Sequence, residues 1–93
     1  MSAIFDGFDS MDAAREFVAA VRERFGLDGQ TFSSAEAAYE HNWFPFEQVP
    51  PIACINRQFE LLRSTEAAFQ EFVATEAAVA ELVSEFGGEF IGT

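Results

Sequence analysis

A run of prolines and aromatic residues from His41 to Pro51 sets the strongest limit on how this chain can fold. It contains all three prolines of the chain, its only histidine and its only tryptophan. Proline fixes φ and lacks an amide donor, so the run can neither continue a helix nor join the centre of a sheet. The sequence therefore predicts an irregular, apolar segment that must either pack on the domain or receive a partner.

Helix starts share a local pattern, in which a serine is followed two positions later by an acid and then by two alanines. The pattern occurs at Ser10, Ser34 and Ser64, where the hydroxyl would cap a helix and the acid would lie in its first turn. These starts predict three helices, over residues 10–26, 34–41 and 64–86. A further echo at residues 74–78 leaves open whether the last stretch is one helix or two. The state of Gln58–Arg63 is also open.

Four short apolar segments alternate with these helices and read as strands. They cover residues 3–8, 29–32, 51–57 and 89–92. The resulting order, strand and helix in alternation with an extra short helix and the aromatic/proline loop between strands 2 and 3, predicts an α+β fold over residues 1–93 as one domain. It resembles the βαββαβ plan of ferredoxin-like folds, in which helices connect parallel strands and both main helices cover one face of the sheet.

Both faces of the predicted sheet are apolar. Successive strand residues point to opposite faces. The opposed sets are Ile4 and Phe8 against Phe5, Ile52 and Cys54 against Ala53 and Ile55, and Ile91 against Phe90. A solvated face would instead show polar alternation. The face without the main helices must therefore be covered, either by Tyr39–Val49 folded back or by a second copy of the chain, and a homodimer is the simpler solution.

The charge balance disfavours two classes of binding partner. Sixteen acids and five arginines give a formal charge of −11, which disfavours binding to nucleic acid and to anionic membranes. An acidic nucleic-acid mimic remains a remote alternative. No segment has the length and apolar character of a membrane span. The single cysteine, Cys54, cannot form an internal disulfide, which indicates a reducing, cytoplasmic location.

His41 is the natural candidate for acid–base catalysis, because its unperturbed pKa lies near neutrality. Tyr39, Glu40 and Glu47 are close to it in sequence, and a carboxylate could orient the imidazole. The simpler interpretation is a histidine that interacts favourably with the C-terminal dipole of a helix. No spacing in the chain fixes a nucleophile or an oxyanion donor, so an enzyme is the second hypothesis rather than the first.

A ligand site is the other interpretation of the aromatic run. The expected contact residues are Tyr39, Trp43, Phe44, Phe46, Glu47 and Arg57, which would receive an apolar small molecule or a peptide. No metal site and no cofactor is predicted, since neither a complete ligand set nor a phosphate-binding glycine pattern is present. Cys54 should be a buried thiol of high pKa. The sequence thus favours a non-catalytic, homodimeric binding module.

Overall fold

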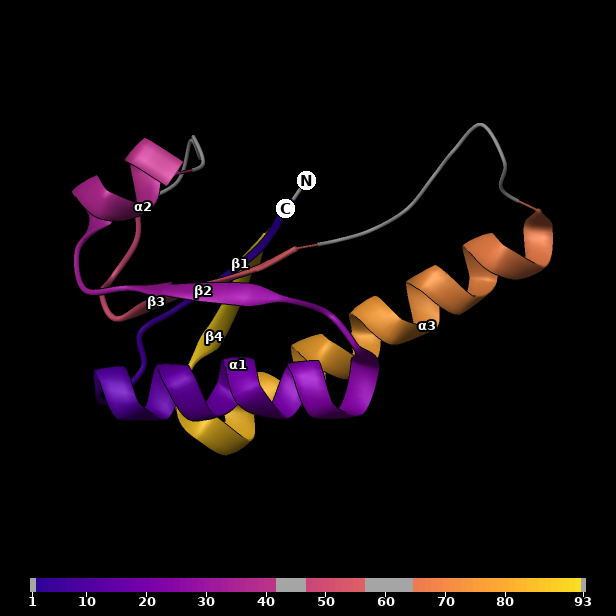
Figure 1. Ribbon diagram of the computed structural model, residues 1–93, viewed down its shortest axis with the longest axis horizontal. Coiled ribbons are helices and arrows are strands. Elements are labelled where there is room, and N and C mark those ends of the chain that lie inside the picture. Colours follow the sequence, from indigo (N-terminus) through magenta and orange to yellow (C-terminus); the bar gives the residue numbers. More distant parts are fainter. Residues whose placement is uncertain (1, 42–46, 57–64, 93) are drawn as a thin grey trace.

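The computed structural model describes residues 2–41, 47–56 and 65–92. Within these ranges four strands form one antiparallel sheet, with the order β2-β3-β1-β4 (Figure 1). The strands are β1 (Ser2–Asp6), β2 (Gly29–Phe32), β3 (Ile52–Asn56) and β4 (Glu89–Gly92). Because β3 is antiparallel to both β1 and β2, those two strands run parallel to each other with β3 between them. The prediction of an α+β fold is confirmed, and each strand ends within two residues of its expected limits.

Helix α1 (Met11–Phe25) connects β1 to β2 and packs on one face of the sheet (Figure 1). The side chain of Ser10 caps it by accepting a hydrogen bond of 3.1 Å from the Ala13 amide. Gly26 ends it in the left-handed conformation, with φ of 67°, which costs glycine little because it has no Cβ. Both boundaries agree with the sequence prediction. Phe17 lies at the centre of the face that α1 buries.

The opposite face of the sheet is covered by helix α2 (Ala35–His41), which lies across the sheet from α1 (Figure 1). Ser34 caps α2 as expected, accepting a hydrogen bond of 3.2 Å from the Ala37 amide. Ala38 packs with Ile4, Ile52 and Cys54, and these three strand residues are at most 2 % exposed in the single chain. The apolar character of this face at β1 and β3 therefore does not by itself require a second copy.

Phe8 does not lie where the strand alternation places it. Gly7, with φ of 72°, turns the chain directly after β1. Phe8 consequently joins the core on the α1 side with Phe5, instead of the opposite face with Ile4. The error came from extending the strand two residues too far. The opposition of two pairs of residues along β3 is confirmed. Ala53 and Ile55 pack in the core on the α1 side, whereas Ile52 and Cys54 pack on the other face with Ala38.

Helix α3 (Glu66–Leu82) is a single helix, followed by the 3₁₀ turn η2 (Val83–Phe86). Its cap is Thr65, whose hydroxyl accepts from the Ala68 amide at 3.1 Å, and not Ser64 as expected; Ser64 lies outside the described residues. Val79, Leu82 and Val83 are buried, whereas the first two turns of α3 extend beyond the sheet (Figure 1). The structure therefore leaves half of this helix outside the core.

Candidate functional site

The residues predicted to bind a ligand are only partly within the described ranges. Trp43, Phe44, Phe46 and Arg57 lie outside them, so their expected contacts stay predictions. Tyr39 and Glu47 are both exposed. An aromatic-lined pocket formed by the His41–Pro51 run is thus neither confirmed nor overturned by the described residues.

His41 ends α2, and its side chain is exposed. Its imidazole lies against the ring of Phe32, with 5.3 Å between the ring centroids. Within the described ranges no ion pair or hydrogen bond joins His41 to a carboxylate, and neighbouring Glu40 is exposed. A general base needs a group that orients it. Its place in the last turn of α2 agrees with the simpler interpretation of a histidine at a helix C-terminus.

The end of the His41–Pro51 run is attached to the domain through the backbone of Val49. The Val49 amide donates to the carboxylate of Asp6 at 2.7 Å, and its carbonyl accepts from the Gly7 amide at 2.7 Å. Asp6 is only 5 % exposed, at the end of β1. Because Val49 is 63 % exposed, Val49 itself is attached through these hydrogen bonds rather than through apolar packing of its side chain. The sequence carries no signal for this pair, since the partners are 43 positions apart.

Cys54 is buried among the apolar residues of β3, as predicted. Burial raises the pKa of its thiol from 9.0 to about 11, because the charged thiolate would lose its hydration. A thiol in this state is a poor nucleophile near neutral pH. Cys54 therefore contributes to packing and supplies no reactive group.

We expect Cys54 to resist a thiol reagent in the folded protein. At about pH 8 a shift of two pKa units lowers the thiolate fraction about a hundredfold, and burial lowers access further. Folding holds the proton on Cys54, so its contribution to stability is complete below about pH 9 and is lost as the pH rises toward about 11. Labelling of native and denatured protein, and alkaline unfolding of the protein and of Cys54→Ala, measure both effects. Equal labelling rates in the two states would contradict the assignment.

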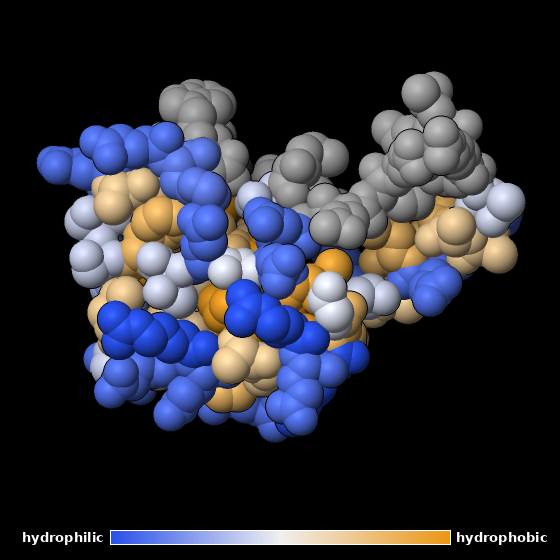
Figure 2. All heavy atoms as spheres, in the orientation of Figure 1, coloured by the Kyte–Doolittle hydropathy of each residue, from blue (hydrophilic) through white to orange (hydrophobic). Residues whose placement is uncertain are grey.

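An exposed apolar groove lies between α3 and β4. Figure 2 shows apolar side chains on the part of the surface formed by the projecting helix. Residues spaced three and four positions apart on α3 and one residue of β4 line a groove of about 430 Å³. They are Phe69, Phe72, Val73, Glu76, Ala77, Ala80 and Phe90. We call this the α3–β4 groove.

Three large apolar side chains of the α3–β4 groove remain open to solvent. Phe69, Val73 and Phe90 are 46 %, 45 % and 39 % exposed. The ring of Phe90 packs against that of the buried Phe5, with 5.2 Å between the ring centroids. Phe69 and Phe72 are three positions apart and belong to one apolar stripe along α3. Helical periodicity identifies an apolar stripe and cannot say whether this chain or another covers it.

The described C-terminal part of the chain, which contains the α3–β4 groove, carries charge of one sign. Residues 65–92 contain six glutamates and no arginine, lysine or histidine. Five of the six are exposed; these are Glu66, Glu71, Glu81, Glu85 and Glu89. The arginines of the described ranges all belong to α1. An apolar groove within an acidic surface therefore distinguishes the C-terminal part of the molecule.

A metal site has no support in the described ranges. These residues include no group of three or more histidine, cysteine or acidic side chains arranged to bind a metal ion. None of the helices described here combines the length and apolar character needed to cross a bilayer. Comparison of the chain with family models, curated proteins and solved structures finds no match.

Proposed function

We propose that this protein is a non-catalytic interaction module, and that the α3–β4 groove binds a basic amphipathic helix of a partner protein. The observation that carries the proposal is the group of exposed apolar side chains, Phe69, Val73 and Phe90, in one groove. Contiguous exposed apolar surface on a small protein is typical of binding sites. The proposal keeps the binding module expected from sequence and moves its site from the proline-containing run to α3.

The shape of the groove favours a helix as the occupant. Two small residues, Ala77 and Ala80, line the groove together with larger ones such as Val73 and Phe90. Small residues let a second helix approach closely, and a row of side chains spaced three and four apart provides ridges against which it can pack. Helix-in-groove binding uses apolar anchors with this same spacing on the partner.

The charge of the surrounding surface favours a basic partner. The five exposed glutamates of residues 65–92 would attract lysine and arginine side chains on the polar face of the incoming helix. The same charge opposes self-association, because two copies of this acidic surface would repel each other. A homodimer through this groove is therefore the less favoured occupant, and light scattering in the absence of peptide tests it.

We expect Ala77→Glu to weaken binding of a designed helical peptide with leucines at i, i+3, i+4 and i+7 and lysines elsewhere by at least tenfold in affinity. The new side chain would project into the groove and place a carboxylate against the leucines. Isothermal titration calorimetry measures the change.

Ala74→Glu is the matched control. Ala74 is an exposed alanine of the same helix that does not line the groove, and the substitution adds the same charge. This variant should bind the peptide as tightly as the unchanged protein. Equal loss in both variants, or loss in neither, would contradict groove binding. A dimer that Ala77→Glu dissociates would instead assign the groove to a second copy.

We also propose that the fold is ferredoxin-like and that the protein works in the cytoplasm. The strand order β2-β3-β1-β4 with antiparallel neighbours supports the first point, because two interleaved βαβ units produce that arrangement. Helix α2 is then an addition between the second and third strands. The buried free thiol of Cys54 supports a reducing compartment.

A further inference from the structure

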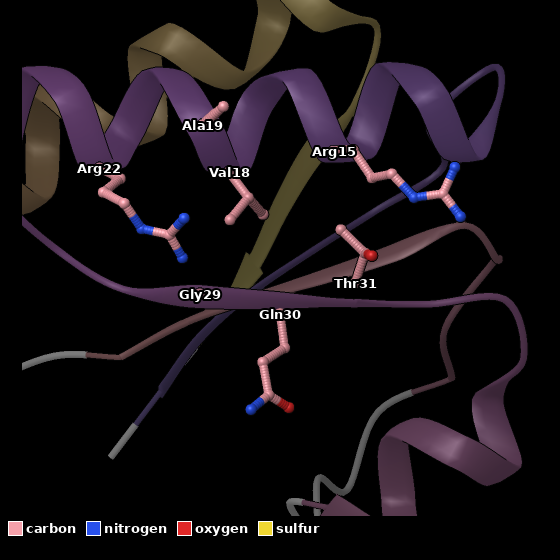
Figure 3. Close-up of a pocket in the computed structure, with 7 residues that line it drawn as sticks. All are labelled: Arg15, Val18, Ala19, Arg22, Gly29, Gln30 and Thr31. Carbon is pink, nitrogen blue, oxygen red and sulfur yellow. The ribbon is translucent and has the colours of Figure 1, made fainter.

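A second groove lies between α1 and β2, at the edge of the sheet. Its volume is about 470 Å³. Arg15, Val18, Ala19 and Arg22 line it from α1, and residues 29–31 line it from β2. Figure 3 shows Arg22 extending from the helix toward the strand and Arg15 running sideways along the helix, with Val18 between them on α1. It is separate from the α3–β4 groove and shares no lining residue with it.

Two arginines, Arg15 and Arg22, line this groove of an otherwise acidic chain. Arg15 and Arg22 are seven positions apart, so they lie on the same face of α1 with about 10 Å between their Cα atoms. Each already has a carboxylate partner at 3.1 Å, Asp12 and Asp28 respectively. The guanidinium side chains are 61 % and 59 % exposed. Ion pairs this exposed contribute little to stability, so a ligand carboxylate can replace them.

The edge of β2 that borders the groove directs main-chain amides and carbonyls away from the sheet. Among residues 2–41, 47–56 and 65–92, β2 pairs with β3 on one side only and is the first strand of the sheet order. Just before β2, the carbonyl of Asp28 accepts a hydrogen bond of 2.7 Å from the amide of Asn56, the last residue of β3. Strand residues alternate in direction, so Gly29 and Thr31 direct their amides and carbonyls away from β3. Both residues line the groove.

We propose that the groove between α1 and β2 binds an extended, acidic segment of a partner protein, which adds a strand to the edge of β2. Gly29 and Thr31 would exchange main-chain hydrogen bonds with the added strand. Side chains at alternate positions of that strand lie on the α1 side of the sheet. Carboxylates there would reach Arg15 and Arg22 and form the charge-assisted hydrogen bonds that arginine favours.

A second copy of this chain fits the groove less well. Pairing β2 with the same strand of another copy would bring two sets of Arg15 and Arg22 toward one interface, without adding acidic side chains beyond Asp12 and Asp28. Such like charges raise the free energy of the complex. An acidic partner adds further carboxylates, and its strand occupies an edge of β2 that no strand of the described part of the chain pairs with.

The test uses a capped peptide that alternates glutamate with valine, and a matched peptide with glutamine in place of glutamate. We expect the glutamate peptide to bind, with amide shifts of Gly29 and Thr31 in NMR spectra, and to weaken as salt is added. Arg15→Gln combined with Arg22→Gln should reduce its affinity at least tenfold. Arg24→Gln is the control, since Arg24 is an exposed arginine of α1 that does not line the groove.

Several results would overturn the proposal. These are an equal loss with Arg24→Gln, equal binding of the glutamine peptide, or amide shifts confined to other elements. Full binding by a glutamate peptide with N-methyl groups at alternate positions would also overturn it, because those groups prevent strand pairing. A dimer in light scattering whose Gly29 and Thr31 amides resist hydrogen exchange would replace the acidic partner by a second copy.

Discussion

Replacing Phe17 with alanine is expected to lower the free energy of unfolding by about 3–5 kcal/mol. Phe17 is fully buried, and its ring lies 4.8 Å from that of Phe5, 5.5 Å from that of Phe8 and 5.9 Å from that of Phe86. It therefore joins β1, the turn after β1, α1 and η2. Alanine would remove these contacts and leave a cavity that the surrounding rings cannot fill without moving.

The loss is large relative to the stability of a chain of this size. Domains of about this length unfold with about 5–15 kcal/mol, and each kcal/mol lowers the melting temperature by about 4–8 °C. We therefore expect Phe17→Ala to melt at least about 12 °C below the unchanged protein, as measured by circular dichroism. Phe69→Ala removes the same side chain from a position that is 46 % exposed. An equal loss in this control would contradict a core centred on Phe17.

Much of the fold could be predicted from sequence because its signals are local. Ser10 and Ser34 cap the helices they were expected to cap, and an N-cap is determined by residues within one turn. The alternation along β3 identified the two faces of the sheet for the same reason. Where a local signal was read too far, as at Gly7 after β1, the placement of Phe8 was wrong.

The candidate sites depend on contacts between distant segments, which a single sequence does not show. The α3–β4 groove exists because α3 extends beyond the sheet and Phe90 lies beside it. The groove at β2 exists because Arg15 and Arg22 lie beside a strand edge. Neither the projection of a helix nor the identity of an edge strand follows from residue spacing. The ligand site was predicted in the aromatic run because of the composition of that run. The α3–β4 groove is proposed instead because its apolar side chains are exposed.

Asp6→Ala is expected to lower the free energy of unfolding by about 1.5–3 kcal/mol and to loosen the chain around Val49. The Asp6 carboxylate accepts the Val49 amide at 2.7 Å from a position that is 5 % exposed. A charged acceptor with so little access to water makes a strong hydrogen bond, and its removal leaves the amide without this partner. Asp6→Asn retains an acceptor without the charge, so it should lose less.

Hydrogen exchange at the Val49 amide separates this effect from a general loss of stability. The amide should exchange faster in Asp6→Ala than global unfolding allows, because its opening would then be local. Asp9→Ala is the control, since Asp9 is an exposed acid three positions away, and its stability should stay within about 0.5 kcal/mol. If both variants lose the same stability, or if Val49 exchanges unchanged, the hydrogen bond from Val49 to Asp6 does not hold this segment. If Val49 alone is released, this hydrogen bond is what fixes the segment around Val49 to the end of β1.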